Sequence, residues 1–163
     1  MIKWLKLPGN QYLGFWILGL VLFFLQEVPY MVMPLLHLET NPIMNMQELS
    51  TVLDLWEKVL GSSCIAMMIF ILHEEAAFFS IQPGRERLFF CVTVGILLIN
   101  WFGWVLYFIG YQSIPVMMLF IVMLPPLYYV AIGLWRNNII LSITGCIFLI
   151  VHFVHVLGNL RLG

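Results

Sequence analysis

The sequence has few charged residues and few cysteines, and both shortages restrict what the protein can be. Only 9% of its 163 residues are charged, against about 25% in a typical soluble domain. Its three cysteines lie singly in apolar stretches, with no CxxC pair, which argues against a disulfide framework or a cysteine-rich zinc site. Its 7 Lys and Arg form no basic patch, so nucleic acid is excluded as a partner.

Long apolar runs fill most of the chain, in which 63% of residues are hydrophobic. About 20 apolar residues suffice for a helix to cross a bilayer. Five stretches meet this length, at about residues 12–36, 53–75, 88–110, 114–135 and 138–158. The sequence therefore predicts an all-α integral membrane protein, with one transmembrane domain over residues 1–163 formed by a bundle of five helices in contact with membrane lipid.

Lys and Arg predict the orientation of this bundle, because cytoplasmic loops carry more of them. In a five-span arrangement one side holds five of them and the other side two: Lys3, Lys6, Arg85, Arg87 and Arg136 against Lys58 and Arg161. We expect the N-terminus in the cytoplasm, the C-terminus outside, and the plasma (cytoplasmic) membrane as the location. Thr51 and Asp54 have the spacing of a capping box, which predicts the start of the second helix there.

A carboxylate stands inside the first run, in the segment "FFLQEVPYMVMP" at residues 23–34. A charged side chain at the centre of a helix costs roughly 2.5–3.5 kcal/mol on insertion scales. Glu27 should therefore face the bundle, where Asn100 and His152 are the candidate partners at matching depth. Pro29 and Pro34 remove backbone donors and leave carbonyls that need other partners.

Polar and small residues recur every three or four positions in four of the runs, which places them on single helix faces. Depth counted at about 1.5 Å per residue puts the polar members of these faces at the midplane or in the outer half. We therefore predict a ligand pocket there, formed by Gln26, Glu27, Tyr30, Asn100, Trp104, Tyr107, His152 and His155. The facing stripe of the second run contains Asp54 and Glu57, and that of the fifth continues to Asn159.

Several functions fit this pattern. The favoured one is binding or transport of a small, partly hydrophobic molecule, because aromatic walls with few polar groups suit such a ligand. The alternatives are a structural or accessory subunit of a membrane complex and an intramembrane enzyme that uses Glu27 and His152 as acid and base. The chain could also associate with a partner membrane subunit or form a homo-oligomer. No cofactor is required, although His152, His155 and Glu27 could hold a metal, and His37 with His155 could ligate haem. No motif assigns the chain to a family.

Overall fold

The computed structural model of the chain describes residues 2–7, 10–73 and 79–162, with side chains as far as residue 160. Its helices are α1 (Ile17–Val32), extended by the short 3-10 turn η1 (Met33–Leu36), α2 (Thr51–Phe70), α3 (Arg85–Phe108), α4 (Ile114–Val116), α5 (Leu124–Trp135) and α6 (Ile139–Leu162). A π-helical segment, η2 (Met117–Val122), joins α4 to α5. The protein is mostly helical, as predicted.

A small sheet corrects the all-α prediction. Strands β1 (Ile2–Leu7), β2 (Gln11–Phe15) and β3 (Ile71–His73) pair antiparallel in the order β1-β2-β3. The first helix therefore begins at Ile17 and not near residue 12. Residues 12–15 continue into the apolar run of the helix that follows, so length and hydropathy alone do not separate the strand from the helix. The sequence feature that indicates a break before the run is "PGN" at residues 8–10, which is typical of turns.

Four helical segments are long and apolar enough to cross a membrane: Ile17–Leu36, Arg85–Phe108, Ile114–Trp135 and Ile139–Leu160. They match four of the five predicted spans, apart from the corrected start of the first. The remaining predicted span, the second in chain order, corresponds to α2. This helix has 20 residues but carries Asp54, Glu57 and Lys58 close to its start. It begins after the N-cap Ser50, whose side chain accepts from Leu53 N, so the capping residue is one position before the predicted Thr51.

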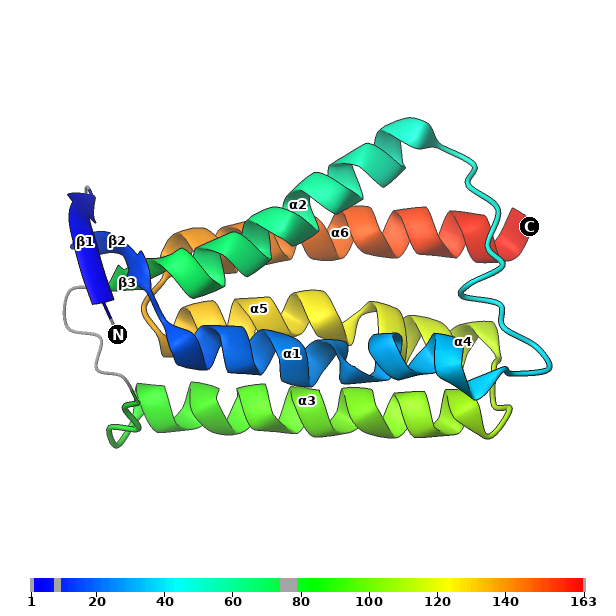
Figure 1. The fold of residues 1–163 in the computed structure, drawn as a ribbon, viewed down its shortest axis with the longest axis horizontal. Coiled ribbons are helices and arrows are strands. Elements are labelled where there is room, and N and C mark those ends of the chain that lie inside the picture. The colour runs from blue at the N-terminus through cyan, green and yellow to red at the C-terminus, as the bar shows by residue number, and fades with distance from the viewer. Residues whose placement is uncertain (1, 8–9, 74–78, 163) are drawn as a thin grey trace.

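The helices lie side by side, with the sheet at one end of the molecule (Figure 1). The N-terminus lies at the sheet end, and the C-terminus lies at the opposite end together with the long connection between α1 and α2. Helix α2 crosses α6 and departs from the other helices toward its own start. The core between α2, α5 and α6 contains Cys64, Met68 and Ile132, which are almost fully buried.

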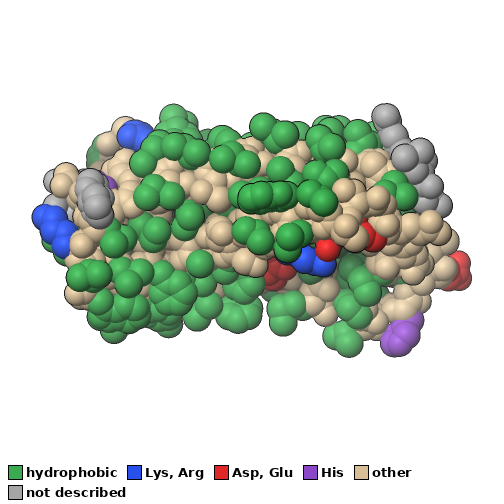
Figure 2. Space-filling model, turned by 90° about the horizontal axis from the view of Figure 1, so that it is seen from above, with side chains coloured by type: hydrophobic (Ala, Val, Ile, Leu, Met, Phe, Trp, Pro, Cys, Tyr) green, Lys and Arg blue, Asp and Glu red, His purple; other side chains and the backbone are tan. Residues whose placement is uncertain are grey.

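The outer surface of the bundle is apolar. Large hydrophobic side chains such as Phe102, Ile143 and Ile150 are more than half exposed, at 55%, 55% and 65%. Figure 2 shows hydrophobic side chains along the whole face seen from above, with Lys and Arg at the sheet end and, next to Asp or Glu, near the middle of the face. An exposed apolar surface of this extent is suited to lipid, in agreement with the four candidate spans.

Prolines in the spans leave backbone carbonyls without their usual donors, and side chains of α3 fill two of these gaps. Pro29 cannot donate to Leu25 O, and the indole of Trp101 donates to that carbonyl instead, at 3.0 Å. Pro125 cannot donate back to Phe120 O in the π-helical register, and Asn100 Nδ2 donates to it at 2.8 Å. These two hydrogen bonds thus attach α3 to α1 and η2 at the level of the two prolines.

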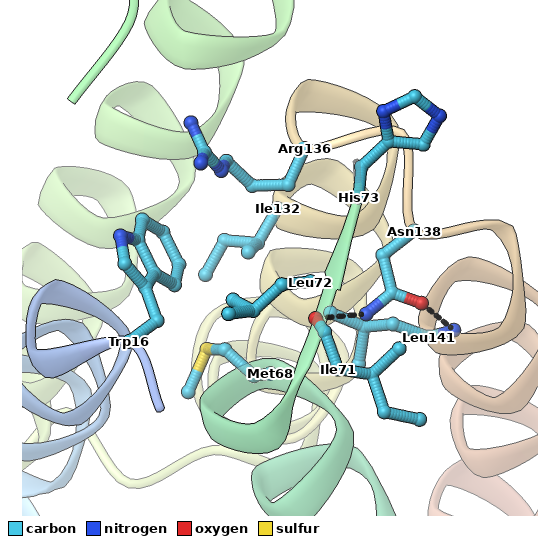
Figure 3. Close-up of a pocket in the computed structure, with 9 residues that line it drawn as sticks. All are labelled: Trp16, Met68, Ile71, Leu72, His73, Ile132, Arg136, Asn138 and Leu141. Carbon is cyan, nitrogen blue, oxygen red and sulfur yellow. Dashed lines mark hydrogen bonds between the residues drawn. The ribbon is translucent and has the colours of Figure 1, made fainter. Parts of the chain in front are cut away.

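Asn138 joins two helix ends beside the sheet (Figure 3). Its Nδ2 donates to Met67 O and Ile71 O, each at 3.1 Å, at the end of α2. Its Oδ1 accepts from Leu141 N at 3.1 Å, as an N-cap of α6. The side chain is buried and borders a cavity of about 10 Å³, whose other walls include Trp16 and Arg136.

Candidate functional site

The predicted polar face of α3 points into the protein. Asn100, Trp104 and Tyr107 are all buried to 1% exposure or less. Asn100 Nδ2 is engaged with Phe120 O, but its Oδ1 is buried and has no hydrogen-bond partner in the part of the chain that the structure describes. The Nε1 of Trp104, one helical turn further on, is also buried without a partner there. An unused acceptor and an unused donor therefore follow each other on one face of α3.

The predicted residues of α1 lie near this face in different environments. Tyr30 stacks edge-on against Trp104, with 4.5 Å between ring centroids. Gln26 is buried, and its Oε1 accepts from the hydroxyl of Tyr129 at 3.0 Å. Glu27 is partly exposed. Neither of its predicted partners, Asn100 or His152, hydrogen-bonds to it among the described residues.

Tyr107 belongs to the end of the bundle that carries the C-terminus. Its hydroxyl donates to Asn41 Oδ1 at 2.7 Å and accepts from Ile43 N at 3.2 Å. Gln112 holds the same connection by donating to Thr40 O at 3.0 Å. Tyr107 therefore fastens the connection between α1 and α2 onto α3, a role that its place on the predicted stripe did not suggest.

The two histidines of α6 meet a carboxylate of α2 and not Glu27. His155 Nδ1 forms a close contact with one oxygen of Glu57, while His152 Nδ1 lies 3.2 Å from the other. The His155 side chain is buried, at 6% exposure. Its Nε2 lies 2.9 Å from Glu48 Oε1 and 3.0 Å from Asn159 Nδ2.

The sequence predicts polar faces on α2 and α6, but it does not predict that these two faces contact each other. Asp54 and Glu57 share one face of α2, and His152, His155 and Asn159 share one face of α6, so the polar faces themselves were predicted. Glu48 was not included, because it lies in the connection before α2 and belongs to no periodic stripe. The helix faces could be read from spacing, whereas the choice of neighbouring helix could not.

An apolar groove lies between α1 and α3, and Trp104 forms part of its lining. It has a volume of about 210 Å³ and is lined by Val28, Pro29, Val32, Trp101, Trp104, Val105 and Phe108. A second hollow, of about 390 Å³, lies where the connection after η1 meets the end of α3, and includes His37, Glu39 and Gln112. Glu27, His152 and His155 line neither of these two.

The two predicted haem ligands lie in different settings. The imidazole of His37 is exposed, with Nδ1 3.0 Å from Leu35 O. The imidazole of His155 is buried, and its two ring nitrogens contact the carboxylates of Glu57 and Glu48.

Comparison with known proteins assigns no relative to the chain. No family model, no curated protein and no solved structure matches it. Three features of the structure bear on function: the groove, the unused polar atoms of α3, and the histidine–carboxylate cluster.

Proposed function

We propose that the protein binds a small, partly hydrophobic molecule in the groove between α1 and α3. The observation that carries this proposal is the buried, unused Nε1 of Trp104, a residue that lines an apolar groove of about 210 Å³. Buried polar groups are nearly always paired in folded proteins. A ligand with an apolar body and one hydrogen-bonding group would fill the groove and supply the missing partner.

The groove suits such a ligand in shape and chemistry. Three aromatic rings, those of Trp101, Trp104 and Phe108, form one wall, and Val28, Pro29 and Val32 form the other. The Trp101 indole is already committed to Leu25 O, which fixes that ring in place and leaves the Trp104 indole as the donor available for recognition. Binding sites of this kind combine mostly apolar walls with a small number of placed polar groups.

We further propose five membrane crossings, in which α2 crosses the membrane in addition to the four candidate spans. The chain passes from the sheet end to the opposite end in α1 and returns in α2, and its termini lie at opposite ends of the bundle (Figure 1). The charged side chains of α2 belong to its first turns, whereas residues 59–70 carry no charge. Those first turns would lie toward the outer interface, with the N-terminus and the Lys- and Arg-rich sheet end in the cytoplasm.

A photoreactive probe tests the groove. We expect the diazirine analogue of octanol to label the segment containing Trp101–Phe108 in a saturable manner, because the groove holds a limited number of molecules. Val105→Trp should remove most of this saturable labelling by filling the groove, since Val105 forms part of its wall. Labelled peptides would be quantified by mass spectrometry of protein in mild detergent.

Val92→Trp is the matched control, because Val92 is on the same helix, is 38% exposed and lies outside the groove lining. It should leave the labelling unchanged. Labelling that rises linearly with probe concentration, or that is equal in the two tryptophan variants, would contradict the proposal.

The accessory-subunit alternative draws on a different feature. Val21, Phe24, Val28, Met31 and Leu35 form an exposed stripe along α1 and η1, spaced by three and four residues. Such a stripe can pack against a partner helix as well as against lipid. A second protein that co-purifies in stoichiometric amount with the chain, and is lost when Phe24 and Met31 are replaced by Ala, would favour this alternative.

A further inference from the structure

The cluster between α2, α6 and the connection before α2 has the composition of a metal site. One ligand atom each from Glu48, Asp54 and His155 can be chosen so that all three lie within 4.8 Å of one another. Ligands of a first-row ion, each about 2.0–2.2 Å from it, are separated by distances of this order. His155 is 107 residues from Glu48 along the chain, so the fold itself brings the imidazole to the two carboxylates.

The imidazole of His155 is oriented as metal-binding histidines usually are. Its Nδ1 contacts the carboxylate of Glu57, and such a carboxylate fixes the tautomer with hydrogen on Nδ1 and the lone pair on Nε2. The Nε2 lone pair then lies 2.9 Å from Glu48 Oε1, and Asp54 offers a further oxygen in the same group of ligand atoms. His152 Nδ1 lies 3.2 Å from the other oxygen of Glu57.

The neighbours of Nε2 indicate which ring nitrogen would bind an ion. Asn159 Oδ1 accepts from Leu49 N at 3.2 Å, which turns the Asn159 amide nitrogen, a donor, toward Nε2 at 3.0 Å. A donor there requires a lone pair on Nε2, so Nε2 is the nitrogen that can bind a cation. Glu48 Oε1 lies 2.9 Å from the same atom, and a cation bound by both atoms would displace the Asn159 amide from this lone pair.

The local charge also favours a cation. Glu48, Asp54 and Glu57 bring three carboxylates into this region, against the single ammonium of Lys58, which lies 2.7 Å from Asp54 Oδ2. We propose that His155, Glu48 and Asp54 bind a divalent first-row transition ion, with Glu57 as the positioning residue behind His155. One imidazole with two carboxylates favours such an ion over Ca²⁺, which prefers oxygen ligands alone. The site is separate from the groove between α1 and α3, so either proposal can fail without the other.

Isothermal titration of the untagged, full-length protein in detergent with Zn²⁺ tests the proposal. We expect one saturable Zn²⁺ per chain, little affected by an excess of Ca²⁺. His155→Gln and Glu48→Gln should each abolish the saturable binding. Glu57→Gln should retain it with an affinity about 10- to 100-fold lower, because it removes an outer-shell partner and not a ligand.

The controls come from the same connection. His37→Gln and Glu39→Gln remove an exposed imidazole and an exposed carboxylate outside the cluster, and both should bind Zn²⁺ like the unaltered protein. The Glu48 side chain is 39% exposed, so Glu48→Gln decides the question even if the His155 variant does not fold. Absence of saturable Zn²⁺ binding, equal competition by Ca²⁺, or undiminished binding in Glu48→Gln would overturn the proposal.

Discussion

Gly103→Ala should destabilise the helical bundle, whereas Gly95→Ala on the same helix should not. A Cβ at Gly103 would lie 2.2 Å from Phe120 Cβ and 3.3 Å from Phe120 Cα, so the backbones of α3 and η2 would have to separate. A Cβ at Gly95 meets nothing within 4 Å. Overpacking of this kind costs about 1–3 kcal/mol, and the separation would also stretch the bond from Asn100 to Phe120 O.

Equilibrium unfolding in mixed micelles, followed by circular dichroism, measures the difference. Gly95→Ala should be neutral or slightly stabilising, because alanine favours a helix over glycine by about 1 kcal/mol or less. Equal stability of the two alanine variants would show that α3 and η2 are not in close contact at Gly103.

Asn138→Ala should lower the free energy of unfolding by about 2–4 kcal/mol, since three hydrogen bonds of a buried side chain are lost together. Two of these bonds satisfy carbonyls at the end of α2, and the third caps α6. Alanine can replace none of them, so Met67 O, Ile71 O and Leu141 N would lose this partner. The ends of α2 and α6 should separate first, which hydrogen exchange would detect at residues 67–73 and 139–142.

Asn137→Gly is the control for this second prediction. Asn137 has a φ of 53°, a left-handed conformation that glycine adopts without strain, so this change should cost little. If Asn138→Ala were as stable as Asn137→Gly, the bonds of Asn138 would not hold the two helix ends together.

The sequence was most informative where one property determined the structure. Unbroken apolar runs bounded by turns were sufficient to locate α3, the α4–α5 segment and α6. They were insufficient at residues 11–15, which form strand β2 and not the start of a helix. Gln11, Tyr12 and Leu13 pair with β3, a segment about sixty residues further along the chain. Pairing between such distant segments leaves no local periodic signal.

The candidate site shows a similar limit. Depth along the helices put Glu57 in the same half of the bundle as His152 and His155, which it contacts, but depth does not specify which helices are neighbours. Helix α2 packs against α6, so Glu57 reaches His152 and His155. Helix α1 packs against α2 and α3, so Tyr30 meets Trp104, and Glu27 hydrogen-bonds to neither predicted partner. The depth of Glu27 in the first span suggested Asn100 and His152 as its partners, but the partners of a side chain depend on which helices pack together.

The five-span topology is the central claim, because it determines which end of the bundle faces the cytoplasm. Reporter fusions to residue 1 and residue 163, one active only in the cytoplasm and the other only outside, measure it most directly. The account predicts cytoplasmic activity at the N-terminus and external activity at the C-terminus. Finding both termini on the same side would contradict it, because α2 would then not cross the membrane.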